Sequence, residues 1–217
     1  MAANIQAAVL VERHPYDVVG FQRMLESFDD CDCFVQPVDL FVQDEDNRAG
    51  YDAVLWYNIH WEPPEGILRE YLENEIGRTK QGIVLLHHAL LSFQDWEVYT
   101  EICGLRRRGS GGLFKYTQNQ TVVQRIADRT HPVTQGLDDF TITDETYTIG
   151  EPEEPGNHIL ITTGNETSIK NLAWTRRYRE SRVFAYASGH DNRAYSHGSF
   201  RQTIHQGLRW AAGKDEA

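Results

Sequence analysis

Histidine is the residue whose placement in this sequence points most clearly to chemistry. Five of the nine histidines, His14, His60, His87, His88 and His190, stand at or just after the end of an apolar run. Imidazole titrates near neutral pH, so it can transfer protons, and in its neutral form it binds divalent metals. One histidine at a strand end is usually a hydrogen-bonded structural residue. Five at the same type of position favour a shared site.

Carboxylates that would complete such a site occur at two places. Asp191 is adjacent to His190, and Asp144 and Glu145 lie in the segment TDETY. Successive side chains of a strand face opposite sides, so Glu145 and Tyr147 are expected to share one face while Asp144 points away. The alternative interpretation of this segment is a solvated acidic turn between strands.

The same alternation applies to the adjacent histidines. His87 and His88 cannot both face one site while the chain is extended, so we expect one of them to begin the turn into a helix that starts at Ser92. Trp61, which follows His60, is an aromatic side chain that could stack on a sugar ring.

The elements that must position these side chains follow an α/β pattern. Apolar runs alternate with helical patterns, which predicts a parallel sheet covered by helices on both faces. The carboxyl ends of such strands border the crevice where ligands bind. The expected parallel strands are residues 5–11, 33–38, 51–57, 82–88 and 182–188. The expected helices are residues 18–28, 63–76, 92–104 and 200–212.

From residue 114 the apolar pattern changes to shorter, alternating pieces. These are residues 114–127, 140–149 and 158–163, separated by polar turns. Alternation of this kind is typical of antiparallel strands with one solvated face. No linker interrupts the chain, so we expect residues 1–217 to form a single domain.

Composition excludes several classes of partner. The formal net charge is −11, and only residues 106–108 form a basic run, so nucleic acid is not an expected partner. No apolar stretch approaches the length of about 20 residues that spans a membrane. The three cysteines lack CxxC spacing, which argues against a disulfide framework and against a cysteine zinc site. We therefore expect a cytoplasmic protein.

Three segments together resemble the ThuA-like (trehalose utilisation) family. They are GIVLLHHALLSFQDW, HPVTQGLDDFTITDETY and RVFAYASGHDNRAYSHGSFRQTIHQGLRWAAG, in that order, and the likeness extends over essentially the whole chain. The resemblance implies a class I glutamine amidotransferase-like fold, which is a flavodoxin-like three-layer sandwich with a mostly parallel central sheet and an antiparallel extension. It also implies a role in carbohydrate metabolism, in association with 3-keto-sugar chemistry.

The resemblance further implies that the amidotransferase nucleophile is missing. His87 falls where the nucleophilic cysteine of an amidotransferase would stand, and His190 falls where the histidine of its triad would stand. After His190 the chain continues with Asp191 and Asn192 instead of x-Glu, so the orienting carboxylate is missing as well. Glutamine hydrolysis is therefore not expected.

These observations predict an enzyme that acts on a sugar or keto-sugar. The expected catalytic residues are His87, His190, Glu145 and Asp191. The expected substrate-binding residues are His14, His60, Trp61, His88 and Tyr147. Alternatively, the same edge of the sheet could bind a divalent metal such as zinc, with His88 and His190 among its ligands.

Two other functions remain open at this point. The first is a non-catalytic sugar-binding or scaffolding protein that keeps the amidotransferase-like crevice. The second is a hydrolase with Ser188 or Ser92 as nucleophile, although neither serine lies in a Gly-x-Ser-x-Gly turn. A homo-oligomer is compatible with either function.

Overall fold

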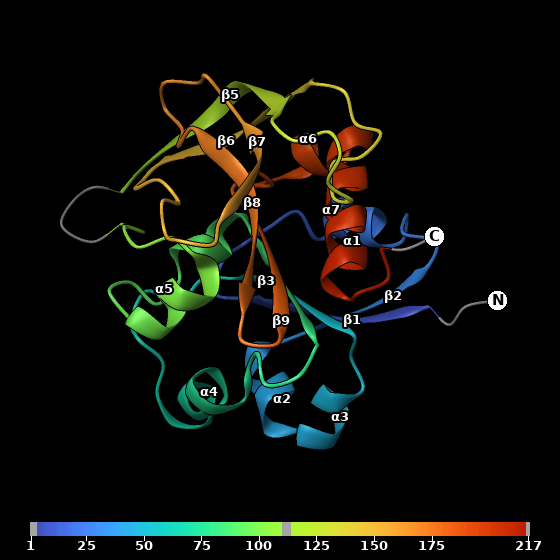
Figure 1. Cartoon of the computed structure of the whole chain (residues 1–217), viewed down its shortest axis with the longest axis vertical. Coiled ribbons are helices and arrows are strands. Elements are labelled where there is room, and N and C mark those ends of the chain that lie inside the picture. The colour runs from blue at the N-terminus through green and yellow to red at the C-terminus, as the bar shows by residue number, and fades with distance from the viewer. Residues whose placement is uncertain (1–3, 110–113, 216–217) are drawn as a thin grey trace.

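The computed structural model describes residues 4–109 and 114–215, and one nine-stranded sheet runs through them (Figure 1). The strands lie in the order β2-β1-β3-β4-β9-β8-β7-β5-β6. Five adjacent strands are parallel: β1 (Ile5–Glu12), β2 (Cys31–Gln36), β3 (Ala53–Asn58), β4 (Gly82–Leu86) and β9 (Ser181–Tyr186). Counted along the chain, these five have the order 2-1-3-4-5, which is that of flavodoxin-like folds.

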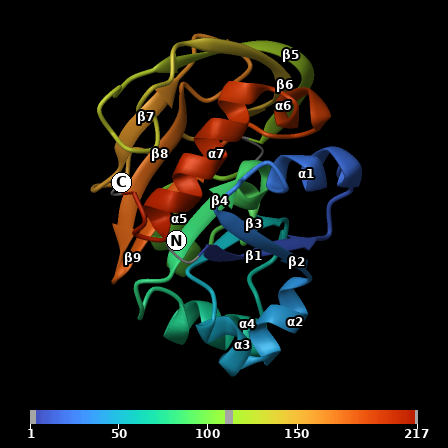
Figure 2. The same ribbon diagram turned by 90° about the vertical axis from the view of Figure 1, so that its right-hand side faces the viewer.

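Helices cover both faces of the parallel strands and complete three layers (Figure 2). One face carries α1 (Val18–Leu25), α6 (Asn192–Tyr195) and α7 (Gly198–Ala211). The other carries α2 (Val38–Gln43), α3 (Glu45–Ala49), α4 (Gly66–Glu70), the π-helical turn η1 (Tyr71–Glu75) and α5 (Glu97–Cys103).

Neighbouring residues of β3 show how the two faces alternate. The ring of Trp56 lies 6.5 Å from that of Tyr71 in η1, whereas Tyr57 stacks on Phe21 of α1 at 4.6 Å. Every residue of β3 and β4 is buried, as strands covered on both faces require. The predicted three-layer α/β fold is confirmed.

The second half of the sheet is antiparallel, as its alternating pattern predicted. It consists of β5 (Lys115–Ile126), β6 (Phe140–Thr148), β7 (His158–Thr162) and β8 (Asn171–Tyr178). The sequence analysis missed β8. Four consecutive residues of that strand, Leu172 to Thr175, are buried, so it lacks the alternation that identified its neighbours.

The helix predicted to start at Ser92 was wrong at its beginning. The chain forms a 3₁₀ turn, η2 (His87–Leu91), and α5 begins only at Glu97. Between them Asp95 adopts a φ of +59°, which an α-helix cannot contain. The predicted end at Gly104 is confirmed, with the left-handed backbone typical of a helix C-terminus.

The helix predicted over residues 63–76 also differs, because it begins at Gly66 and changes to η1 at Tyr71. No helix within residues 4–109 and 114–215 is long and apolar enough to cross a membrane.

Candidate functional site

The site is built around His87, the residue at which β4 turns sharply into η2. Its φ is +53°, in the left-handed region that non-glycine residues rarely adopt. Such a conformation costs about 1–3 kcal/mol and occurs preferentially at functional sites. Nδ1 of His87 lies 2.8 Å from the carbonyl oxygen of Ala187, just after β9. Because a carbonyl oxygen only accepts hydrogen bonds, Nδ1 carries the proton and Nε2 presents a lone pair to the site.

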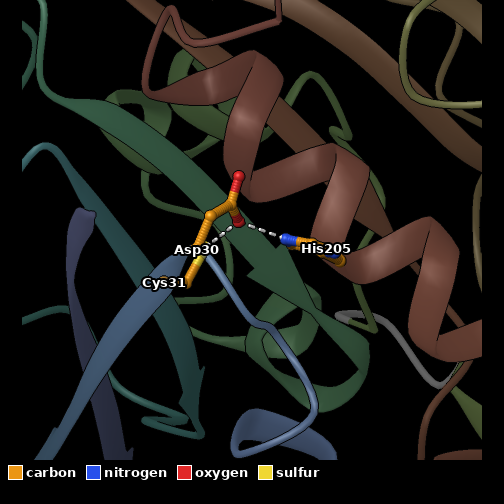
Figure 3. A group of neighbouring side chains, drawn as sticks. All are labelled: Asp30, Cys31 and His205. Atoms are coloured by element: carbon orange, nitrogen blue, oxygen red, sulfur yellow. Dashed lines mark hydrogen bonds and ion pairs between the residues drawn. The ribbon is translucent and has the colours of Figure 1, made fainter. Parts of the chain in front are cut away.

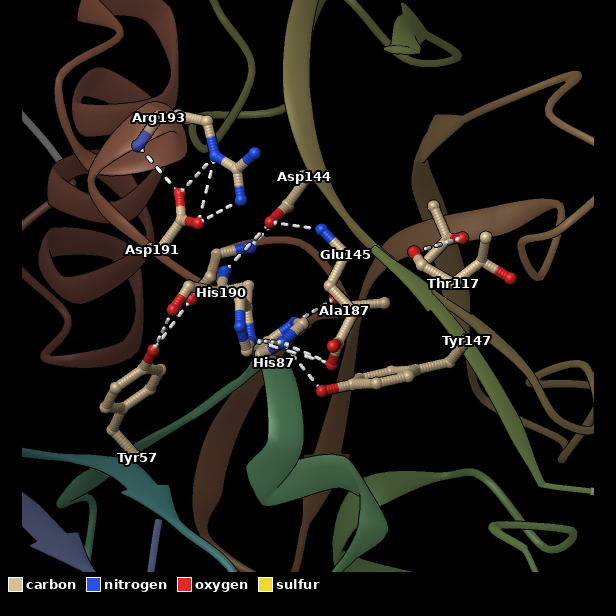
Figure 4. Close-up of polar contacts among 12 residues, drawn as sticks. Tyr57, His87, Thr117, Asp144, Glu145, Tyr147, Ala187, His190, Asp191 and Arg193 are labelled. Carbon is tan, nitrogen blue, oxygen red and sulfur yellow. Dashed lines mark hydrogen bonds and ion pairs between the residues drawn. The ribbon is translucent and has the colours of Figure 1, made fainter. Parts of the chain in front are cut away.

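Three further polar groups converge on Nε2 of His87 (Figure 4). The Tyr147 hydroxyl lies 2.6 Å away and Nδ1 of His190 3.3 Å away. Oε1 of Glu145 is 3.7 Å from Nε2 of His87 and 3.5 Å from Nδ1 of His190. The predicted sharing of one strand face by Glu145 and Tyr147 is therefore confirmed, and the alternative of a solvated turn is wrong because Glu145 is only 6% exposed.

Asp144, on the opposite face of β6, fixes the position of these groups. Its fully buried carboxylate accepts hydrogen bonds from the backbone N–H of Gly189 (2.7 Å), His190 (2.9 Å) and Glu145 (2.9 Å). Burial raises the pKa of Asp144, while His87 and the three N–H donors oppose that rise. The carboxylate thus holds the loop after β9 against β6. It also fixes the backbone of His190 and Glu145, whose side chains face each other across this contact.

Gly189 is required at this loop for two reasons. Its φ is +117°, and a Cβ at this position would lie 2.8 Å from the Phe200 ring. A larger residue would therefore push the loop and His190 away from β6.

His14 and His88 form the neighbouring wall of the site. Their rings stack with centroids 4.1 Å apart, and the far side of His88 packs on Tyr57 at 4.3 Å. Although His88 is 1% exposed, neither of its ring nitrogens has a hydrogen-bond partner among the described residues. Unpaired buried nitrogens are costly, so they indicate a group that a ligand or water completes.

A pocket of about 260 Å³ opens onto this cluster. Predicted site residues that line it are His14, Trp61, His88, Glu145, Tyr147 and His190. Phe114, Tyr116 and Gln118 close it from the start of β5, together with Ile59 and Leu91. The sequence analysis missed these five, although residues 114, 116 and 118 alternate as one strand face does.

His60, the remaining predicted histidine, lines a second pocket instead. This pocket has a volume of about 560 Å³ and shares Ile59 and Trp61 with the first. His60 is 8% exposed, and its Nε2 lies 3.6 Å from Oε2 of Glu12. Trp61, with 48% of its surface exposed, thus forms part of the wall of both pockets.

Asp191 lies next to the cluster but does not line either of these pockets. Its side chain accepts a hydrogen bond from the backbone N–H of Arg193 at the start of α6 and forms an ion pair with the Arg193 guanidinium. These contacts lower its pKa in spite of partial burial. The structure therefore gives Asp191 a capping role, and its catalytic role stays a prediction.

Burial and neighbouring groups shift the pKa of Glu145 and of three imidazoles at the pocket wall. Burial alone would raise the pKa of Glu145, but its contacts with His87, His190 and Tyr147 outweigh burial and lower it. Burial lowers the pKa of His14, His88 and His190, and the neighbouring imidazoles lower each of them further. At neutral pH the pocket therefore combines an ionised Glu145 with neutral His14, His88 and His190.

The family model for ThuA, described as trehalose utilisation, matches residues 22–211. The chain belongs to the ThuA family. A putative ThuA-like protein from Parabacteroides merdae ATCC 43184 has a similar structure, with a TM-score of 0.78, 22% identity, and coverage of 96% of this chain and 90% of that one. None of the curated proteins compared with the sequence matches it.

Two amidotransferase-related structures share the fold of this ThuA-family chain. A putative GMP synthase protein from Thermoplasma acidophilum gives a TM-score of 0.58 at 9% identity, covering 98% of this chain and 96% of that one. PurLQS from Thermotoga maritima gives 0.54 at 14% identity, covering 95% and 99%. The predicted class I glutamine amidotransferase-like fold is confirmed.

The thiols of this chain lie away from the pocket. Cys31 and Cys33 are in β2, at the edge of the sheet, and Cys103 is buried at the end of α5. The strained turn between β4 and η2, a position that could carry a nucleophile, is occupied by His87 instead of a cysteine.

Proposed function

We propose that this ThuA-family protein is an enzyme that acts on a sugar or keto-sugar and moves a proton at the carbon next to a carbonyl group. The observation that carries the proposal is the convergence of Glu145, Tyr147 and His190 at the wall of one small pocket, with the buried imidazole of His87 directly behind them. Acid/base chemistry requires groups of these types within hydrogen-bonding reach of each other and of a ligand.

Glu145 is the proposed general base. It faces the pocket, and its lowered pKa leaves it ionised at neutral pH. His190 is its proposed partner, because Nδ1 faces the carboxylate while the side chain is 19% exposed and reaches the pocket. The imidazole of His190 is the group available to stabilise negative charge that develops on a carbonyl oxygen, because the single proton of the Tyr147 hydroxyl is donated to Nε2 of His87.

His87 serves as a positioning residue in this proposal. The Ala187 carbonyl fixes its ring, and its Nε2 then holds the hydroxyl of Tyr147 at 2.6 Å. The strained turn thus presents an imidazole lone pair that orients the phenol, instead of a nucleophile that would attack the substrate.

The rest of the pocket suits a small, hydroxylated ligand. A volume of about 260 Å³ lies just below the usual range of about 300–1,000 Å³ for ligand sites, which favours a single sugar ring over a larger molecule. The exposed ring of Trp61 can stack on such a ring. The nitrogens of His14 and His88 that lack partners would bind its hydroxyl groups.

Three expectations from the sequence accompany this proposal. A divalent metal such as zinc suits the site, since imidazole and carboxylate are among the ligands that it prefers. A cytoplasmic location is in keeping with three free cysteines. The homo-oligomer stays a prediction.

The test is hydrogen–deuterium exchange of keto-sugars in D₂O, followed by proton NMR. Loss of the signal from the carbon next to the carbonyl reports proton abstraction, whether the overall reaction is isomerisation, epimerisation or elimination. We expect at least one of a panel of keto-glucosides to exchange faster with the protein than in buffer. Binding of a panel member without exchange, with and without added divalent metal, would support the non-catalytic sugar-binding protein instead.

A further inference from the structure

We propose that His87, Glu145 and His190 bind one divalent metal ion of the zinc type and leave a coordination position open toward the pocket. This inference rests on the proposed function for its biological purpose and names the cofactor of the same site. The metal site expected from the sequence used His88 and His190, but the atoms that converge with His190 belong to His87 and Glu145.

The spacing of the three atoms carries the inference. Zinc binds imidazole nitrogen at about 2.0–2.1 Å and carboxylate oxygen at about 2.0–2.2 Å, so neighbouring ligands of a tetrahedral site lie about 3.3–3.5 Å apart. The separations here are 3.3 Å between the two imidazole nitrogens, 3.5 Å from Glu145 to His190 and 3.7 Å from Glu145 to His87. The two separations that involve Glu145 exceed the usual N–H···O hydrogen-bond range of about 2.7–3.2 Å, and all three lie close to the ligand spacing of a tetrahedral face.

The protonation pattern already suits a metal. The Ala187 carbonyl takes the Nδ1 proton of His87, so Nε2 faces the other two ligands with its lone pair. Metal-binding histidines typically donate their second N–H to a carbonyl or carboxylate in this way. Asp144 then holds the backbone of both other ligands, so the three groups stay together without an ion.

A second group of metal-ligating residue types, Asp30, Cys31 and His205, shows what this spacing means elsewhere in the chain (Figure 3). There the carboxylate of Asp30 is occupied: one oxygen lies 2.5 Å from Nε2 of His205, and the other pairs with the Arg209 guanidinium. Burial raises the pKa of the Cys31 thiol to about 12, so it supplies no thiolate at neutral pH. The adjacent guanidinium of Arg209 and the protonated thiol of Cys31 both oppose binding of a cation. This group therefore serves as the matched control for the proposed metal site.

Tyr147 gives the proposal its most specific consequence. Its hydroxyl hydrogen-bonds to the lone pair of His87 that an ion would need. A bound ion would take the place of this hydroxyl at Nε2 of His87 and would use Oε1 of Glu145, which leaves Oε2 as the base of the proposed function. The Tyr147→Phe variant is therefore expected to bind metal at least as tightly as the wild type, whereas a purely structural role of this tyrosine would weaken binding.

The experiment uses the purified full-length chain, stripped with chelator and titrated with Zn²⁺ against a chromophoric chelator. We expect about one zinc per chain and an affinity that falls by more than about 100-fold in Glu145→Gln and His190→Gln, since loss of outer-shell groups alone costs 10–100-fold. His205→Gln should bind zinc as the wild type does. Thermal unfolding of each stripped variant shows that the variants are folded.

Cobalt substitution provides a readout that does not depend on activity. Co²⁺ bound in the proposed site should give the intense visible absorption of a tetrahedral complex, and that absorption should be absent from Glu145→Gln. No zinc binding by the folded wild type, or binding that Glu145→Gln and His190→Gln leave unchanged, would overturn the proposal. Metal binding without keto-sugar exchange would refute the proposed function alone, and exchange by a protein that binds no metal would refute the metal site alone.

Discussion

Replacing Asp144 by asparagine should destabilise the protein far more than the same change at the partly exposed Asp191. The buried carboxylate accepts three backbone N–H bonds, two at Oδ1 and one at Oδ2. An amide can keep one oxygen but turns an NH₂ group toward at least one of these donors. A hydrogen bond to a charged group contributes about 1.5–3 kcal/mol, so Asp144→Asn should lower the free energy of unfolding by about 2–3 kcal/mol.

For a chain of this length, each kcal/mol corresponds to about 2–4 °C in Tm, so the expected loss is roughly 4–12 °C at pH 7. Asp191→Asn keeps a good helix-capping residue and loses only a partly exposed ion pair, for which about 0–1 kcal/mol is expected. The assay is thermal and urea unfolding of both variants. Equal stability of the two would show that Asp144 does not hold the loop after β9 against β6.

Three further predictions address packing, pH and ligand binding. Gly207→Ala in α7 should lower the free energy of unfolding by about 1–3 kcal/mol, because a Cβ there would lie 2.2 Å from the Phe184 ring. Urea unfolding should show no such loss in Gly198→Ala, where a Cβ has free space. Burial lowers the pKa of His131 in the folded state, and its Nδ1 accepts a backbone N–H. Its stabilising contribution is therefore complete above the unfolded-state pKa of about 6.5 and is lost as the pH falls toward the lower folded-state pKa. Between pH 8 and 5, Tm should fall less steeply in His131→Asn than in the wild type. Trp61→Ala should leave Tm within about 1–2 °C of the wild type but weaken binding of an exchanging keto-sugar about tenfold or more, measured by calorimetry; unchanged affinity would remove Trp61 from the site.

Much of the fold was predictable because it depends on local patterns. Apolar runs and helical periodicity identified all five parallel strands, and the carboxyl ends of three of them carry His14, His87 and His190. β8 was missed because burial on both faces removes its alternation. The helix expected at Ser92 failed because the backbone N–H groups of Phe93 and Gln94 bond to the carbonyl oxygens of His60 and Trp61, and such tertiary bonds are not encoded in local residue preferences.

The site was predictable in its members more than in its geometry. Strand alternation correctly placed Glu145 and Tyr147 on one face. It could not show that Asp144, on the other face, holds the loop that carries His190, since that contact joins segments 46 residues apart. Proximity in sequence made Asp191 a candidate, yet its side chain turns to the α6 N-terminus. Strand order determines which residues meet across the sheet, and local sequence patterns do not predict strand order.

The central claim is that Glu145 removes a proton from the carbon next to a sugar carbonyl, and one comparison tests it most directly. The keto-sugar with the fastest exchange is incubated in D₂O at saturating concentration with the wild type, with Glu145→Gln and with Glu180→Gln, an exposed residue in the β8–β9 turn at the opposite end of β9. The account predicts an exchange rate about 10²–10⁴-fold lower in Glu145→Gln, with the sugar still bound, and an unchanged rate in Glu180→Gln. Exchange by folded Glu145→Gln at the wild-type rate would contradict it.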